Sequence, residues 1–92
     1  MEELKNIKEL INQDKADEAI LALDQIIKSE NLKAKDEAYY LRGNAYRKKG
    51  DWKKALDNYL EAIEINPNSP ALHAKDMLMD ILNFYNKDMY NQ

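Results

Sequence analysis

The side chains that most often carry out chemistry in proteins are scarce in this chain. It contains no cysteine and one histidine, His73, and its two serines, Ser29 and Ser69, stand where helices are expected to end or begin. The carboxylates are numerous but spread over what read as exposed helix faces, so no acid–base pair stands out. A metal site needs clustered ligands, and His73 with Asp76 does not make a cluster. We therefore expect no enzyme activity, no metal site and no cofactor.

The densest group of charges is a basic cluster around a tryptophan in the segment GNAYRKKGDWKKALDNYLEAIEINP, residues 43–67. Its members are Arg47, Lys48, Lys49, Lys53 and Lys54, and the aromatic residue is Trp52. One interpretation is a nucleic-acid surface, which requires an exposed ring on which bases stack. The other is the solvated side of a turn between two packed helices. The second is favoured if Trp52 belongs to the core, since a net charge of −3 gives no general attraction to nucleic acid.

Length and composition limit the class of protein. The 92 residues, 45% hydrophobic and 34% charged, suffice for one small domain with a modest core. The chain has no run of apolar residues long enough to span a bilayer, and its charged start, MEELKNIKEL, lacks the apolar centre of a signal peptide. We expect a cytoplasmic protein that contacts no membrane and is held together by helix packing without disulfides.

The hydrophobic pattern predicts helices that position these residues. Apolar side chains recur at spacings of three and four, which is typical of helices, and no alternating strand pattern is present. The expected helices cover residues 4–11, 16–27, 38–49, 52–65 and the segment that Ser69-Pro70 opens. Asp14, Asp51 and Ser69 are the expected N-caps, and Gly50 and Asn66-Pro67 are expected to end helices. The prediction is an all-α chain of five helices.

The helices come in pairs that repeat. The segment ADEAILALDQII (16–27) superposes on WKKALDNYLEAI (52–63) at an offset of 36 residues, which matches Ala19 with Ala55 and Leu23 with Tyr59. Small residues at matched positions allow the two helices of a pair to approach closely. One pair cannot bury its apolar face alone, so a second pair is expected to stack on it and the fifth helix to cover the open end.

Residues 36–69 resemble one complete tetratricopeptide repeat, a helix-turn-helix unit of 34 residues. The resemblance rests on these residues at fixed spacing: Tyr39, Gly43, Tyr46, Gly50, Trp52, Ala55, Tyr59, Ala62 and Pro67. Arg42 departs from the pattern, because the family prefers a large apolar residue there; we expect its aliphatic stem to pack while its charge reaches solvent. The resemblance places Tyr46 and Trp52 at core positions, which leaves the basic cluster without an exposed ring, so we expect the solvated side of a turn and no nucleic-acid partner.

The rest of the chain resembles the same family less closely. Residues 2–33 are similar to a degenerate first repeat, which has Ile7 in place of the glycine and Ala16 in place of the turn aromatic. Residues 70–88 stand where the family places its terminal capping helix. The resemblance implies a single domain over residues 1–92, folded as a right-handed superhelical stack of antiparallel helix hairpins.

The resemblance also implies a function and a site. In the family, the first helix of each repeat lines a concave groove that takes a peptide or helix of another protein, so we expect a protein-interaction module. The groove positions of the family fall on Lys8, Ile11 and Asn12, on Glu37, Tyr40, Asn44, Arg47 and Lys48, and on Lys75, Leu78 and Leu82. The alternative for Asn44 and Arg47 is ordinary exposed helix surface.

Some family members grip a terminal carboxylate with lysines, asparagines and an arginine, and this chain matches that set only in part. Asn44 and Lys75 fit, whereas Lys8 stands where an asparagine is needed and Ala71 where a lysine is expected.

The last predicted helix has an unusually wide apolar face. Its apolar residues are Ala74, Met77, Leu78, Ile81, Leu82, Phe84, Tyr85 and Met89. On a helical wheel they span roughly 160°, against about 100° for a typical surface helix. A capping helix that lies in the cleft between both helices of the preceding repeat needs such a face. The alternative is an apolar strip that seals a homodimer or receives a partner helix.

Overall fold

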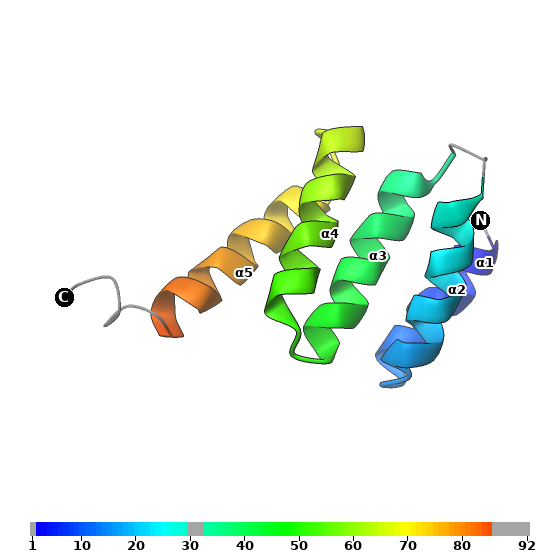
Figure 1. The fold of residues 1–92 in the computed structure, drawn as a ribbon, viewed down its shortest axis with the longest axis horizontal. Coiled ribbons are helices and arrows are strands. Elements are labelled where there is room, and N and C mark those ends of the chain that lie inside the picture. Colours follow the sequence, from blue (N-terminus) through cyan, green and yellow to red (C-terminus); the bar gives the residue numbers. More distant parts are fainter. Residues whose placement is uncertain (1, 30–32, 86–92) are drawn as a thin grey trace.

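Five helices form a linear stack in the computed structural model, which describes residues 2–29 and 33–85. They are α1 (Glu2–Asn12), α2 (Ala16–Lys28), α3 (Lys35–Lys48), α4 (Trp52–Ile65) and α5 (Ala71–Tyr85). The pairs α1/α2 and α3/α4 stand side by side as antiparallel hairpins, and α5 crosses α4 obliquely at the far end (Figure 1). No strand occurs in the described residues. The predicted all-α stack of helix hairpins is confirmed.

The turn of the second hairpin is built as the sequence predicts. Gly50 has a φ of +80°, and its N–H donates to the carbonyl of Arg47 at 3.0 Å. The N–H of Asp51 donates to the carbonyl of Tyr46 at 2.9 Å, which completes a Schellman motif at the end of α3. The Asp51 carboxylate accepts from the N–H of Lys54 at 3.2 Å. Gly50 as the helix stop and Asp51 as the N-cap are therefore confirmed.

The turn of the first hairpin corrects one prediction. Asp14, predicted to be the N-cap of the second helix, instead ends α1 in the left-handed region with a φ of 61°. Its N–H donates to the carbonyl of Ile11 at 3.1 Å, and that of Lys15 donates to the carbonyl of Leu10 at 2.8 Å. This is the same Schellman motif, because Asp14 precedes Gly50 by the 36-residue offset of the repeat. α2 begins after Lys15 without a side-chain cap.

The core consists of two hydrophobic clusters joined by tyrosines. The first lies between α1, α2 and α3 and contains Leu4, Ile7, Ile11, Ala16, Ala19, Ile20, Leu23, Ile26, Ala38, Leu41 and Ala45. The second lies between α4 and α5 and contains Ala55, Tyr59, Ala62, Ala71 and Leu78. Tyr40 and Tyr46 of α3 pack against both clusters, so the two hairpins and α5 share one continuous interior.

Gly43 is small because an aromatic ring lies against it. A Cβ atom at this position would lie 2.5 Å from Cε1 of Tyr59 and 3.2 Å from the backbone oxygen of Ala55. The Tyr59 side chain is completely buried. The predicted close approach of the two helices at Gly43 and Ala55 is therefore confirmed, with the Tyr59 ring as the nearest neighbour.

The guanidinium of Arg42 is held inside the stack, which corrects the prediction that its charge reaches solvent. Nη1 donates to Oδ1 of Asp24 on α2 at 2.8 Å, and Nε donates to Oδ1 of Asn58 on α4 at 2.7 Å. The guanidinium also lies 5.3 Å from the ring centroid of Tyr39. Arg42 thus takes its family position with polar contacts to both hairpins.

The end of α4 and the start of α5 follow the predicted signals. Asn66 is the C-cap of α4. The Oγ of Ser69 accepts from the N–H of Ala71 at 3.0 Å, so Ser69 caps α5 as predicted. The predicted capping helix covers residues 70–88, of which 86–88 lie outside the described residues, as does Met89.

Candidate functional site

One part of the predicted groove is a hollow between α1 and α3, here called the α1–α3 hollow. It has a volume of about 270 Å³ and is lined by Lys8, Ile11, Asn12, Tyr40, Leu41 and Asn44. Ile11 and Leu41 are buried and form an apolar floor, whereas Lys8 and Asn12 are exposed at the rim. Five of the predicted groove residues are thus brought together.

A further predicted groove residue, Glu37, lies beside this hollow and pairs with one of its members. Its Oε1 is 3.2 Å from Nζ of Lys8, and both side chains are about half exposed. The ion pair joins α1 to α3 across the predicted groove. Because the pair is exposed, it contributes little stability and can exchange for a ligand's charges.

Asn44 is held in place from behind by the buried tyrosine of α4. The Tyr59 hydroxyl donates to Oδ1 of Asn44 at 2.6 Å. Burial raises the pKa of this hydroxyl above its ordinary value of 10.0, partly opposed by the charge of the nearby Arg47 guanidinium and a hydrogen bond from it. The Tyr40 ring packs against Tyr59 with centroids 6.2 Å apart. Asn44 and Tyr40 therefore share one buried support, the Tyr59 side chain.

A second hollow lies between the end of α3 and α5, here called the α3–α5 hollow. Arg47, Lys48, Trp52 and Ile81 line a volume of about 390 Å³. It adjoins another of about 460 Å³, lined by Trp52, Asp80, Ile81 and Phe84, and the name α3–α5 hollow is used for the two together. Trp52, predicted to be in the core, is only half-buried. Its ring packs against the second core cluster and also forms a wall of both hollows.

The placement of Leu78 in the groove is wrong, and Lys75 and Leu82 lie on the same face of α5 as Leu78. Leu78 is 0% exposed within the second core cluster, and Leu82 packs against the same cluster. Lys75 lies one turn before Leu78 on that face and forms an ion pair with the adjacent Asp76 at 3.5 Å.

The error has a specific cause, which is the spacing between the second repeat and α5. Ala71, Ala74 and Leu78 follow their buried counterparts Ala38, Leu41 and Ala45 by 33 residues, not by the 34 of the repeat. The one-residue difference turns α5 by about 100°. It moves the groove positions to His73, Met77, Asp80 and Ile81, which are exposed or half-exposed. A comparison of the small residues Ala38 and Ala71 would have shown this spacing in the sequence.

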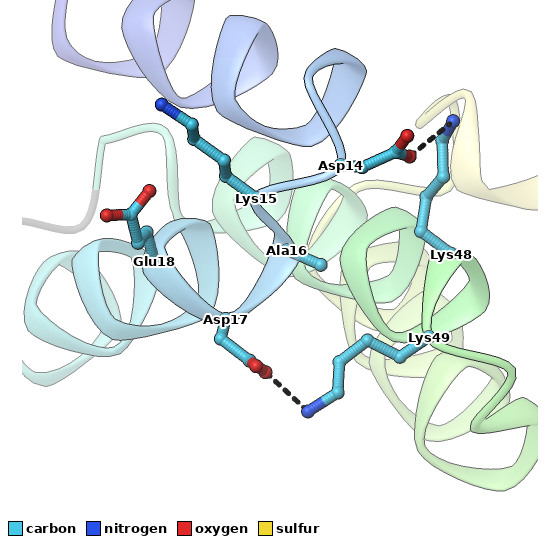
Figure 2. Close-up of a pocket in the computed structure, with 7 residues that line it drawn as sticks. All are labelled: Asp14, Lys15, Ala16, Asp17, Glu18, Lys48 and Lys49. Atoms are coloured by element: carbon cyan, nitrogen blue, oxygen red, sulfur yellow. Dashed lines mark hydrogen bonds and ion pairs between the residues drawn. The ribbon is translucent and has the colours of Figure 1, made fainter.

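The basic cluster is partly neutralised by the turn of the first hairpin (Figure 2). Nζ of Lys48 lies 3.7 Å from Oδ1 of Asp14, and Nζ of Lys49 lies 2.5 Å from Oδ1 of Asp17. The hydrogen bond and the charge of Asp17 raise the pKa of Lys49 above 10.5. These ion pairs connect the end of α3 to the α1–α2 turn across a hollow of about 410 Å³. The arrangement favours the turn interpretation of the cluster.

Residues 2–29 and 33–85 contain neither a membrane-spanning helix nor a cluster of metal ligands. No helix there is long and apolar enough to cross a membrane. No three histidine, cysteine, aspartate or glutamate side chains in these ranges lie close enough to hold a metal ion.

Comparison with known proteins identifies the class of repeat. Residues 36–69 match the family model of the tetratricopeptide repeat, which is the segment that the motif and the α3/α4 hairpin define. The chain belongs to the tetratricopeptide repeat family.

A solved structure resembles the whole chain. The solution NMR structure of Bacteroides fragilis protein BF1650 has a TM-score of 0.89 and 65% sequence identity, and the match covers 100% of this chain and 92% of that one. At this identity and coverage the two proteins belong to the same family.

Two curated relatives are similar over a repeat region only. The peptidyl-prolyl cis-trans isomerase CYP7 of Saccharomyces cerevisiae is 32% identical over 68 residues, 72% of this chain and 17% of that protein. The DnaJ homolog subfamily C member 3 homolog of Dictyostelium discoideum is 36% identical over 70 residues, 76% of this chain and 14% of that protein. The chain therefore spans less than a fifth of the length of either relative.

Proposed function

We propose that the protein is a non-catalytic interaction module, which holds a peptide or helix of another protein in the groove formed by α1, α3 and α5. The observation that carries this proposal is the α1–α3 hollow, where Lys8, Ile11, Asn12, Tyr40 and Asn44 surround one cavity. The family membership supports it, since tetratricopeptide repeats generally serve as protein-interaction units. The proposal treats residues 1–92 as one domain and places it in the cytoplasm.

The mechanism is the display of fixed side chains on a rigid support. Asn44 is fixed by the Tyr59 hydroxyl, and Tyr40 is fixed by the Tyr59 ring. A ligand that binds to side chains already in position loses less conformational entropy than one that must order them. The apolar floor of Ile11 and Leu41 offers surface for an apolar side chain, and the polar rim sets its orientation.

The test is a selection from an unbiased peptide-display library on the immobilised wild-type protein. The comparison variant is Lys8→Ala/Asn12→Ala/Arg47→Ala, in which all three changed residues are exposed. The control variant is Glu61→Ala/Glu64→Ala on the exposed side of α4. We expect the selected peptides to bind the wild type and the control but not the triple variant. Equal binding to all three proteins would show that the groove is not the binding surface.

A second candidate function, self-association through α5, rests on exposed apolar residues. Leu72 is 44% exposed and Met79 is 38% exposed. By the 33-residue spacing they are the counterparts of Tyr39 and Tyr46, which in α3 face the second core cluster. A second copy that packs on this face would bury them. Leu72→Glu/Met79→Glu is then expected to convert a dimer into a monomer in sedimentation equilibrium, whereas a wild-type monomer at all concentrations would exclude this function.

A further inference from the structure

Asn44 presents a hydrogen-bond donor to a ligand. The Tyr59 hydroxyl donates to Oδ1 of Asn44 at 2.6 Å, which uses one of the two lone pairs of this oxygen and orients the amide. The NH₂ group of Asn44 can then donate to a carbonyl or carboxylate oxygen of a ligand. The α1–α3 hollow therefore has a donor on its α3 side.

The next turn of α3 adds an arginine without an acidic partner in the described part of the chain. Among residues 2–29 and 33–85, ion pairs engage Lys8, Lys48 and Lys49, but none engages Arg47. Lys48, beside it, is held only by an exposed aspartate at 3.7 Å. Arg47 and Lys48 form one end of the α3–α5 hollow. A carboxylate placed there would meet a guanidinium that is able to bind both of its oxygens.

The other wall of the α3–α5 hollow is apolar. Trp52 is half-buried, Ile81 is half-buried and Phe84 is 76% exposed, and all three line the hollow. Flat aromatic surface beside a cation suits a large apolar or aromatic side chain. Asp80 lies at this far end. The hollow is therefore basic at α3, apolar in the middle and acidic at α5.

We infer that the α3–α5 hollow recognises an acidic segment of a partner protein, with side-chain carboxylates at Arg47 and Lys48 followed by a large apolar side chain between Trp52, Ile81 and Phe84. This inference rests on the proposed function, for which it names the chemical class of the partner. The acidic side chains of the partner bind at the α3 end of the hollow. Beyond the apolar side chain, the negative charge of Asp80 disfavours further acidic residues.

The only tryptophan of the chain lies in the hollow, so its fluorescence reports binding directly. The probes are acetylated and amidated peptides Gly-Glu-Glu-Leu-Phe-Gly, with versions in which Gln replaces both Glu residues or Ala replaces Phe. We expect a saturable change of Trp52 fluorescence, with binding of the Glu peptide about tenfold tighter than of the Gln peptide. The difference should shrink in about 1 M sodium chloride, where the Debye length is about 3 Å.

Three variants make the test specific. Arg47→Gln should weaken the Glu peptide about tenfold and leave the Gln peptide unchanged. Asn44→Asp keeps an oxygen for the Tyr59 hydroxyl but replaces the donor with a negative charge, so it should also weaken the Glu peptide. Asp80→Asn, the control at the other end of the hollow, should leave the affinity for the Glu peptide unchanged or increase it.

The inference is overturned if no peptide changes the fluorescence, if the Glu and Gln peptides bind equally, or if only peptides with a free terminal carboxylate bind. Its failure differs from failure of the proposed function. If the unbiased library gives neutral or basic peptides whose binding needs Lys8 and Asn12, the groove remains the binding surface. The acidic segment is then ruled out as its ligand.

Discussion

The guanidinium of Arg42 joins the two hairpins through a hydrogen-bonded ion pair with Asp24. The Nη1–Oδ1 distance is 2.8 Å, and the side chains are only 22% and 32% exposed. Asp24 belongs to α2 of the first hairpin and Arg42 to α3 of the second. Arg42 stands where other tetratricopeptide repeats have a large apolar residue. The first and second hairpins are therefore joined at this position by polar contacts.

Arg42→Ala should lower the free energy of unfolding by about 1–3 kcal/mol. The change removes the donor to Asp24 and leaves Oδ1 of Asn58, a residue that is 6% exposed, without its partner. Urea unfolding measures the loss. The control is Lys48→Ala, which breaks an exposed pair with Asp14 and should cost less than about 1 kcal/mol. Equal losses for the two variants would show that the Arg42 contacts do not stabilise the stack.

Gly43→Ala should also be destabilising, by about 1–3 kcal/mol, although alanine is the better helix former. The new methyl group would have to displace the Tyr59 ring, which lies 2.5 Å from its position. Chemical unfolding of Gly43→Ala, Tyr59→Leu and the double variant measures the coupling. We expect the double variant to lose less than the sum of the two single losses, and strict additivity would argue against this contact.

Asp14→Gly should stabilise the protein by about 1 kcal/mol, because Asp14 occupies a left-handed conformation that costs a residue with a side chain about 1–2 kcal/mol. The substitution also removes the exposed ion pair with Lys48, in which Nζ and Oδ1 are 3.7 Å apart, but this loss offsets little of the gain. The reverse substitution, Gly50→Ala at a φ of +80°, has no steric contact and should destabilise by a similar amount. Thermal unfolding of both variants checks these two expectations, and a loss of stability for Asp14→Gly would contradict the first.

The stability of the protein should fall at alkaline pH because of Tyr59. The pKa of its hydroxyl is raised above 10.0, chiefly by burial. The unfolded chain therefore loses this proton first, so above pH 10 it binds fewer protons than the folded chain and stability decreases with rising pH. Below pH 10 this contribution is fully present. Unfolding of the wild type and of Tyr59→Phe between pH 7 and 11 should show a smaller alkaline decrease for the variant, and parallel curves would contradict the prediction.

Two neighbouring residues of α5 test its rotation in the stack. Leu78 is 0% exposed and Met77 is 48% exposed. Leu78→Ala should therefore lower the free energy of unfolding by about 2–5 kcal/mol, whereas Met77→Ala should cost less than about 1 kcal/mol. Urea unfolding compares them directly. A larger loss for Met77→Ala would mean that Met77 is the buried residue, as the 34-residue spacing predicts, and would contradict this rotation of α5.

The architecture was predictable because it depends on local signals. Gly50, Asp51 and Ser69 mark helix ends by conformational and capping preferences that belong to the residue itself. Asp14 was misassigned for the same reason. Aspartate is a good N-cap, and only the repeat offset from Gly50 indicates that it occupies the C-terminal turn of α1.

The grouping of the candidate groove residues in space was predictable where the repeat is regular and not where it changes. Lys8, Ile11, Asn12, Tyr40 and Asn44 line one hollow, as the family spacing predicts. Leu78 does not belong to the groove, because a one-residue change in spacing turns α5. Neither the polar environment of Arg42 nor the half-buried position of Trp52 follows from spacing, since both depend on side chains of other helices.

The most direct test of the central proposal is an NMR titration of the ¹⁵N-labelled protein with a peptide from the unbiased selection. We expect concentration-dependent shifts of the side-chain NH₂ of Asn44 and of backbone N–H groups on α1 and α3 around Lys8, Asn12 and Arg47. The exposed residues Leu60 and Glu64 of α4 should remain unchanged. Shifts confined to α4, with none at Asn44, would contradict the assignment of the groove as the binding surface.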